Sequence, residues 1–500
     1  MGTPEAARVS RWTPDRLVLA LGLAGGLLLV FVTPPFHVPD EPAHFFHAYQ
    51  VATAAAAEAG PGGAIGYRLP ASLRELAELC TAGVAFHPMR RLPPGLLAAA
   101  WRLPLAPERS VFLPAGSLTL YTPVPYLAAA AGVAAGRVLG LGPLALLYLA
   151  RLGNLAAALA VSWLAVRIAP AQRWLLALLA LTPMAMFERS SASADALTNA
   201  LPLLLVSCLL SLVLRRVADP AERQPAGRRS VLLLLATALL VAAAKGVYFL
   251  LDLLVFLVPP VGRAGRIAPA CPRPRPRARA VAGLWAGGLA AAAAGAGISL
   301  WVTQRFASLG LPRLGVHPED QLRGVLAAPL HFLGLAAADY VHHLPRYAAG
   351  FVGTFGWLDT PLPRPSMVLW GLLLLAAALT GGDPALALAA WQRQLAAAIT
   401  GAVLLLLSLS QYVTWTPLGA GFVDGLQGRY FLPVAPVAAI LFYNRRLAVR
   451  EAGGEAGGPA AAGGLPAPPA PAAAGWLYGG LSVAFTVLTL LCIWFRYHGV

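Results

Sequence analysis

Long runs of apolar residues alternate with short polar segments along almost the whole chain. A helix needs roughly 20 apolar residues to cross the ~30 Å hydrocarbon core of a bilayer. Eleven runs approach this length and are predicted to be membrane-spanning helices: 16–33, 146–167, 174–188, 196–214, 231–245, 247–259, 281–302, 366–380, 395–413, 430–444 and 476–496. The pattern therefore predicts an all-α, polytopic membrane protein in which residues 1–500 form one domain.

A twelfth apolar segment, residues 121–139, is interrupted by prolines at its start and by Gly132 and Gly136. If it crossed the membrane, every later loop would change side, and the arginine-rich stretch 264–280 would be exported. Short loops rich in Lys and Arg stay on the cytoplasmic side. We therefore expect 121–139 to be a juxtamembrane or re-entrant helix on the outer face, with the N-terminus inside and the C-terminus outside.

This topology leaves three sizeable outer segments, residues 34–145, 303–365 and 414–429. Within the second of these, residues 321–344 are expected to lie along the outer interface, because Asp339, His342 and His343 fit poorly in lipid. The Gly/Pro/Ala-rich stretch 453–475 is predicted to be a flexible inside linker.

Composition agrees with the apolar pattern. Of the 500 residues, 58% are hydrophobic and 12% are charged, against about 25% charged in soluble domains, so a soluble protein is excluded. A net charge of +16 would suggest nucleic acid in a soluble protein, but here the basic residues lie mostly in short loops, and we expect no nucleic-acid partner.

The abundance of Ala, Gly, Pro and Arg, with Lys245 as the single lysine, indicates a GC-rich bacterial genome and hence the bacterial cytoplasmic membrane. The four cysteines have no CxxC spacing, so neither a zinc site nor a disulfide framework is indicated.

The first candidate site follows the first predicted span. Asp40 and Glu41 lie among four prolines, which stiffen the backbone around two adjacent carboxylates. One reading is a reactive carboxylate pair at the membrane surface; the other is capping of a helix that starts at Pro42. Asp40, His44 and His47 also have helix-face spacing, which permits a metal site but is more typical of interfacial histidines on an amphipathic helix.

The second acidic position is Asp195, at the next outer junction between predicted spans. Capping is again the alternative, with Ser193 as N-cap and Asp195 in the first turn. Lys245 and Arg429 lie at outer ends of spans, where the positive-inside rule disfavours them. They either bind an anion or extend to lipid headgroups.

Arg151 and Asn154 are three residues apart in an otherwise apolar span. An arginine at the bilayer centre costs roughly 2.5 to 3.5 kcal/mol, so this polar face is expected to point into the bundle.

Five motifs in this order resemble a bacterial family of predicted integral membrane proteins, domain-of-unknown-function family 2142. They are PPFHVPDEPAH at 34–44, ARLGN at 150–154, SADAL at 193–197, GWLDT at 356–360 followed by Pro363, and QGRYFLP at 427–433. That family in turn resembles the GT-C glycosyltransferases, which take a sugar from a polyprenyl-phosphate carrier on the outer side of the membrane. The resemblance implies a GT-C-like fold with juxtamembrane helices in the first outer loop, acidic residues at Asp40, Glu41 and Asp195, and no particular substrate.

A polyprenyl-phosphate leaving group is already anionic, so its departure needs cations, for which we single out Arg429, Lys245 and Arg151. Asp40 is then the base that accepts the proton of an acceptor hydroxyl from an envelope glycan or lipid. Glu41 and Asp195 either orient the acceptor or, with Asp40, hold a divalent cation such as Mg²⁺ or Mn²⁺. Further candidates for contact with the substrate are His44, Asn154, Trp357, Asp359, Trp415, Gln427 and Tyr430; the aromatic ones also suit an interfacial belt.

Two other classes of function remain. A transporter or flippase of lipid-linked sugars would need ionisable residues near mid-membrane, and Asp252 is the one plausibly deep acid. A non-catalytic envelope assembly protein would use Asp40 and Asp195 only as helix caps.

Overall fold

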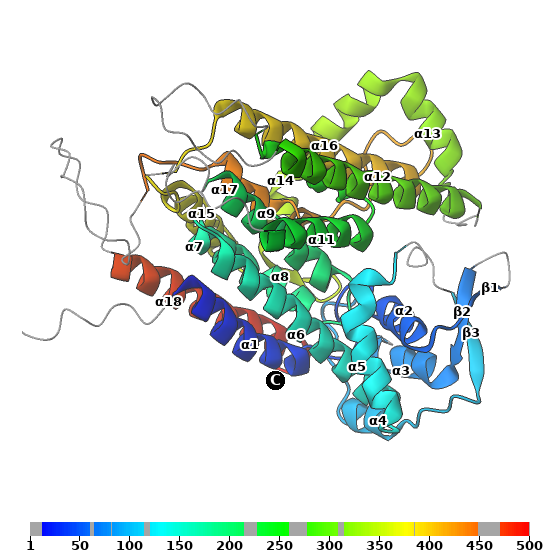
Figure 1. The fold of residues 1–500 in the computed structure, drawn as a ribbon. Helices are drawn as coiled ribbons and strands as arrows, with labels where there is room; N and C mark the ends of the chain where they lie inside the picture. The colour runs from blue at the N-terminus through cyan, green and yellow to red at the C-terminus, as the bar shows by residue number, and fades with distance from the viewer. Residues whose placement is uncertain are drawn as a thin grey trace, which may run out of the picture.

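The computed structural model describes residues 13–60, 65–81, 83–114, 121–214, 228–259, 278–308, 315–384, 386–448 and 471–499. Residues 453–470 of the predicted linker lie outside the described residues. So do residues 264–277 of the arginine-rich stretch 264–280. The described chain is mostly helical and forms a bundle with a smaller lobe at one end (Figure 1).

Among the described residues, six helices are long and apolar enough to cross a membrane, fewer than the eleven predicted. The six are α1 (Pro14–Val32), α6 (Pro143–Ile168), α9 (Asp195–Val213), α12 (Ala278–Ser308), α16 (Ala390–Thr414) and α18 (Pro471–Tyr497). Each coincides with a predicted span. The chain is accordingly a multi-pass membrane protein.

The other five predicted spans are shorter or broken. Residues 174–188 divide into α7 (Arg173–Ala180) and α8 (Pro183–Arg189), 247–259 form the 3-10 helix η5 (Phe249–Leu257), and 430–444 form η6 (Gly428–Phe431), η7 (Ala435–Val437) and α17 (Ala438–Leu441). Helices α11 (Arg228–Ala244) and α15 (Arg364–Thr380) have 17 residues each, about 26 Å at 1.5 Å per residue. The apolar runs therefore predicted helical segments here, but two are short single helices and three are broken or 3-10 segments.

Helices α13 (Pro318–Ala327) and α14 (Pro329–Gly353) are bent by 106° at their junction and would add a seventh span if counted together. Asp339 in α14 is buried; it accepts hydrogen bonds from Tyr347 Oη at 2.6 Å and from His343 Nδ1 at 2.9 Å. Its polarity is therefore satisfied within its own helix.

The two ends of the bundle are marked by contacts between distant segments. At one end Arg173 pairs with Asp15 at 2.7 Å, near the start of α1. At the other, His498 Nε2 lies 3.1 Å from the carbonyl oxygen of Val32, where α1 ends. Helices α1 and α18 thus lie side by side and run in the same direction, and the described ends of the chain lie at opposite ends of the bundle (Figure 1).

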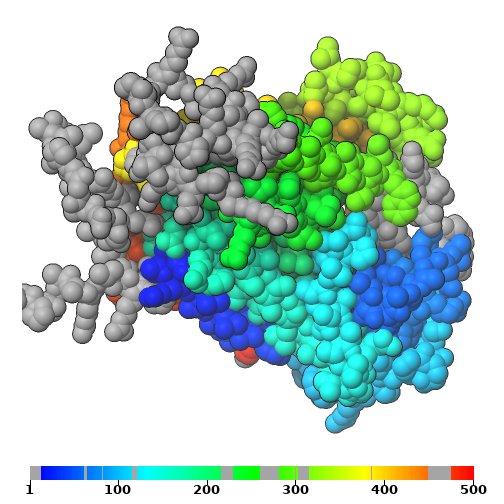
Figure 2. Space-filling view, in the orientation of Figure 1, coloured from blue at the N-terminus to red at the C-terminus, as the bar shows by residue number. Residues whose placement is uncertain are grey.

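The N-terminal lobe, residues 34–138, is visible in blue and cyan at one end of the bundle (Figure 2). It contains α2 (Glu41–Thr53), α3 (Ala71–Thr81), α4 (Leu96–Arg102), η4 (Val124–Tyr126), α5 (Leu127–Val138) and an antiparallel sheet of β1 (Ala57–Ala59), β2 (Ile65–Pro70) and β3 (Ser110–Pro114). In this sheet Tyr67 of β2 pairs with Ala57 of β1 on one side and with Leu113 of β3 on the other. A second pair of strands, β4 (Thr354–Phe355) and β5 (Thr360–Pro361), follows α14. The described chain is therefore mostly helical, as predicted, with a few short strands that the all-α prediction did not include.

The ambiguous segment 121–139 forms η4 and α5, and α5 is too short to span. It packs closely on α6 through glycine: a Cβ on Gly132 would lie 2.1 Å from the carbonyl oxygen of Leu149, and one on Gly153 would lie 2.3 Å from that of Ala128. This backbone contact fixes the lobe on the end of the bundle.

Candidate functional site

Two groups of buried charges lie where the lobe meets the bundle. The first, which we call the closed pair, is Glu41 at the start of α2 and Arg151 in α6. Both side chains are fully buried, and the guanidinium binds the carboxylate through two bonds of 2.8 and 2.6 Å. Such two-point pairs are among the strongest polar contacts in proteins.

Every polar atom of the closed pair has partners. Arg151 also donates to the carbonyl oxygens of Val30 at 2.8 Å, Thr33 at 2.7 Å and Pro34 at 2.9 Å. The Glu41 carboxylate also accepts from the backbone N–H groups of Phe36 and Ala192, at 3.0 and 3.1 Å. The pair thus ties the end of α1, the start of α2 and the loop before α9 to α6, and it leaves no free donor for a phosphate.

The second group, which we call the open cluster, surrounds Arg429 in η6. Its guanidinium contacts three carboxylates: Asp40 at 3.0 Å, Glu188 at 3.2 Å and Asp195 at 3.4 Å. Lys245, just after α11, lies 3.3 Å from the other oxygen of Asp195. Three acids and two cations leave one formal negative charge, and all four contacts are longer than those of the closed pair.

Asp40 is the accessible member of the open cluster. Its side chain is 55% exposed, against 0% for Glu188, 3% for Arg429 and 9% for Asp195. Its backbone lies in the left-handed region, with φ of 61°, and its side chain makes no capping hydrogen bond to α2. The predicted capping role is therefore not what the structure contains; the carboxylate is directed to Arg429 instead.

Asp195 does lie in the first turn of α9, as the capping alternative required, where the helix dipole favours a negative charge. The preceding turn is held by Ser193, whose hydroxyl accepts a hydrogen bond from the backbone N–H of Asp195 at 3.1 Å. Asn154 supports the same loop by donating to the carbonyl oxygens of Ser191 and Ser193, both at 2.9 Å. The serine and the asparagine hold the loop, and the Asp195 carboxylate remains available to the two cations.

Aromatic rings line the cation side of the open cluster. The Lys245 ammonium lies 4.6 Å from the Tyr430 ring centroid and 5.5 Å from that of Tyr121, within cation–π range. Gln427 accepts a hydrogen bond from Arg429 Nε at 2.7 Å and so orients the guanidinium. Cationic and aromatic groups together suit a ligand that carries an anion beside a less polar surface.

Two histidines of α2 continue the polar region into the lobe. His44 Nδ1 lies 2.7 Å from Tyr126 Oη, and His47 Nδ1 lies 3.0 Å from Tyr67 Oη. Burial lowers the pKa of His44 to about 4, an effect that Asp195 and Asp40 only partly oppose, and burial also lowers the pKa of His47 to about 4. Both imidazoles are therefore neutral at pH 7.

A family model matches residues 23–438, which include both groups of charges and all the elements that position them. The chain belongs to the DUF2142 family of predicted membrane proteins. No curated protein and no solved structure matches it. The family assignment agrees with the resemblance of the five motifs and supplies no reaction.

In this DUF2142 protein the GWLDT segment does not join the open cluster. Asp359 pairs with Arg496 of α18 at 2.8 Å, and the Trp357 ring packs against Phe86 at 4.7 Å. Asp359 therefore holds the C-terminal end of α18 and Trp357 packs against the lobe, and none of these contacts is with the open cluster. Their predicted contact with the substrate gains no support from this position.

The predicted divalent-cation set is not assembled. Glu41 is bound to Arg151, and Arg429 contacts both Asp40 and Asp195. Among the described residues no group of three His, Cys, Asp or Glu side chains is arranged to hold a metal ion. A guanidinium lies between Asp40 and Asp195, where a shared cation would need to be, so this arrangement gives the divalent-cation alternative no support.

Sequence reasoning missed one member of the open cluster, Glu188. It is fully buried, and its second carboxylate oxygen has no hydrogen-bond partner. A carboxylate at the end of an apolar run in an acid-poor chain was the available signal. It also missed Tyr126, whose ring packs against both α2 histidines.

Proposed function

We propose that this DUF2142 protein is a membrane glycosyltransferase that moves a sugar from polyprenyl phosphate to a hydroxyl of an envelope glycan or lipid. The observation that carries the proposal is the open cluster: one exposed carboxylate, Asp40, contacts the buried Arg429, and the partly buried Lys245 lies on the far side of Asp195. A transfer from a phosphate-linked sugar needs this combination, a base for the acceptor and cations for the leaving group.

The reaction is a single displacement. The acceptor oxygen attacks the anomeric carbon, its proton passes to the Asp40 carboxylate, and the bond between the anomeric carbon and the phosphate oxygen breaks. The electron pair leaves with polyprenyl phosphate, whose added negative charge Arg429 and Lys245 stabilise. The anomeric configuration is inverted.

The two cations are held in a way that suits exchange of partners. Their contacts with Glu188 and Asp195 are 3.2 to 3.4 Å long, against 2.6 Å for the closed pair. A phosphate can replace such loose contacts at lower cost than a saturated two-point pair. Glu41, Arg151 and Asn154 act as positioning residues, because they fix the loops that carry Asp40 and Asp195.

The test compares purified wild type with Asp40→Asn in detergent. Release of radiolabelled sugar is measured from a panel of polyprenyl-phosphate sugars, with a membrane extract as the source of acceptor. Asparagine tolerates the left-handed backbone of residue 40, so the variant should fold. We expect wild type to consume one donor and Asp40→Asn to be at least about 100-fold slower.

Asp320→Asn is the matched control. Asp320 is half exposed in α13, where it pairs with Arg323, and its loss should leave sugar release unchanged. Equal rates for wild type and well-folded Asp40→Asn would refute the role of Asp40. The absence of any donor consumption across the panel would refute the transferase.

One observation favours a second candidate, a transporter of lipid-linked sugars. Asp252 in η5 is fully buried, and neither of its carboxylate oxygens has a hydrogen-bond partner. Deep ionisable groups of this kind mark transport and proton pathways. A labelled lipid-linked sugar that changes leaflet in liposomes with wild type, but not with Asp252→Asn, would place the transporter first.

A further inference from the structure

A buried arginine with no anionic partner lies inside the bundle, next in sequence to Glu188 of the open cluster. Arg189 ends α8 and is 3% exposed. Its guanidinium donates to two neutral carbonyl oxygens, that of Ala185 at 3.3 Å and that of Ala180. No carboxylate of the described residues forms an ion pair with it. A buried charge without a counter-charge is costly.

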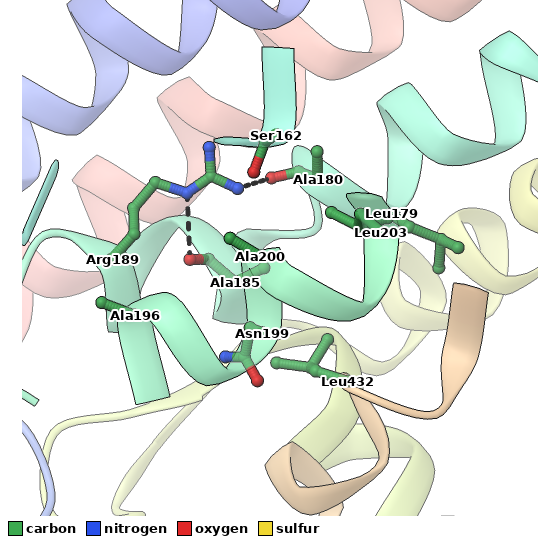
Figure 3. Close-up of a pocket in the computed structure, with 10 residues that line it drawn as sticks. All are labelled: Ser162, Leu179, Ala180, Ala185, Arg189, Ala196, Asn199, Ala200, Leu203 and Leu432. Carbon is green, nitrogen blue, oxygen red and sulfur yellow. Dashed lines mark hydrogen bonds between the residues drawn. The ribbon is translucent and has the colours of Figure 1, made fainter. Parts of the chain in front are cut away.

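A small cavity adjoins this guanidinium. The centre of a water-sized sphere can move through about 10 Å³ of it, and apart from three polar residues it is lined by alanine and leucine side chains from α7, α8, α9 and the segment after η6. Arg189, Ser162 and Asn199 are the polar lining residues. Figure 3 shows the Ser162 hydroxyl beside the guanidinium and the Asn199 amide on the opposite side, near Leu432.

Each of these three residues has a buried polar atom without a hydrogen-bond partner: Arg189 Nη1, Ser162 Oγ and Asn199 Nδ2. All three atoms can donate a hydrogen bond, and Ser162 is fully buried. Unsatisfied buried donors are rare in folded proteins and call for a partner. All three residues therefore lack a hydrogen-bond acceptor, and Arg189 also lacks a negative charge nearby. A bound anion would supply both.

We propose that this cavity binds a monovalent anion of halide size, chloride in particular. A halide is only slightly larger than water, accepts several hydrogen bonds at once and supplies the missing charge. Tetrahedral phosphate and sulfate are too large for the space and too strongly hydrated for its apolar walls. The anion would be the counter-ion that allows Arg189 to remain charged within the bundle.

The site lies close to the open cluster but is distinct from it. Asn199 is one turn beyond Asp195 in α9, and Leu432 is three residues after Arg429. The proposal does not depend on the proposed transferase, because it concerns a bound ion that the full chain should hold without any sugar donor.

The direct experiment is equilibrium binding of ³⁶Cl⁻ to purified wild type in detergent. We expect saturable binding of one ion per chain, displaced by bromide but not by gluconate or phosphate. Thermal unfolding is followed through tryptophan fluorescence at constant ionic strength. The unfolding temperature should rise by about 2 °C when gluconate is replaced by saturating chloride.

Arg189→Met removes the charge with little change in length, and it should abolish both ³⁶Cl⁻ binding and the chloride dependence of unfolding. Arg173→Met is the matched control, because Arg173 already pairs with Asp15 at the bundle end; it should keep both properties. If Arg189→Met does not fold, wild-type binding alone decides. An unfolding temperature equal in chloride and gluconate, with no saturable ³⁶Cl⁻ binding, would overturn the proposal and leave water as the occupant.

Discussion

The closed pair and the open cluster use the same kinds of side chain at the same end of the bundle, yet they differ in hydrogen-bond saturation and in access to solvent. Glu41 and Arg151 have no exposed surface, and the pair is completed by three carbonyl oxygens and two backbone N–H groups. The open cluster has longer contacts, one unpartnered carboxylate oxygen on Glu188 and an acid, Asp40, that is more than half exposed.

The difference shows how adjacent residues can take opposite roles. Asp40 and Glu41 are neighbours in sequence, but one turns to Arg429 and the other to Arg151. A saturated pair stabilises the fold and has no capacity to bind anything else. An unsaturated cluster contributes less to stability and retains the capacity to bind a ligand.

The largest effect on stability is expected from the closed pair. Glu41→Gln should lower the free energy of unfolding by about 3–5 kcal/mol, because it leaves Arg151 charged and buried without its carboxylate. Thermal unfolding in detergent and the yield of monodisperse protein measure the loss. Glu78→Gln is the control, since Glu78 is exposed and its contact with Arg74 is 3.6 Å long. Similar stability for the two variants would mean that the closed pair is not structural.

A smaller loss is expected when the open cluster loses its central cation. Arg429→Gln leaves Glu188 and Asp195 with Lys245 as the remaining cation, and should cost about 2 kcal/mol. Arg429→Lys keeps the positive charge but lacks the guanidinium that donates to several carboxylates at once, so it should recover part of the loss. The same unfolding assay distinguishes them from the exposed control Arg323→Gln. A loss as large as that of Glu41→Gln would remove the contrast between the two groups.

Acidification should act on the lobe side of the open cluster. Burial lowers the pKa values of His44 and His47 from 6.5 to about 4. Between these values the unfolded chain binds more protons, so stability falls as the pH falls from about 6.5 towards 4, by up to about 1.4 kcal/mol per pH unit for each histidine.

His47→Gln should make this decline less steep, because it removes one of these groups and keeps a hydrogen-bonding side chain beside Tyr67. Unfolding temperatures of both proteins measured from pH 7.5 to pH 5 test the expectation. Parallel pH profiles would show that His47 does not contribute.

The smallest effect on stability is expected at Asp40. Asp40→Asn keeps a side chain that tolerates positive φ, and it removes the charge of one ion pair on its solvent-accessible side; exposed pairs are typically worth 0–1 kcal/mol. Unfolding should therefore shift little, in contrast to the expected loss of sugar release. A large destabilisation by Asp40→Asn would instead mark it as a structural residue like Glu41.

Part of the site could be predicted from the chain. Asp40, Asp195, Lys245 and Arg429 were each expected at the outer ends of spans, and the fold brings all four together. Glu188 was not selected, because nothing in the sequence indicates that the end of α8 faces Arg429. Nor could the sequence show that Glu41 and Arg151, which are 110 residues apart, form an ion pair.

The long apolar runs determined where the six candidate spanning helices lie, because an apolar run of that length is buried in lipid or protein as a helix. They could not determine which shorter runs break. The break between α7 and α8 frees backbone carbonyl groups; that of Leu178 accepts a hydrogen bond from the Thr182 hydroxyl at 3.0 Å, and that of Ala180 accepts one from Arg189. A broken helix is tolerated where side chains supply such partners. Sequence alone thus determined the charge and the order of the long apolar helices. Tertiary structure decided which carboxylate became saturated and which remained open, because hydrogen bonds between distant segments exist only after the helices have packed.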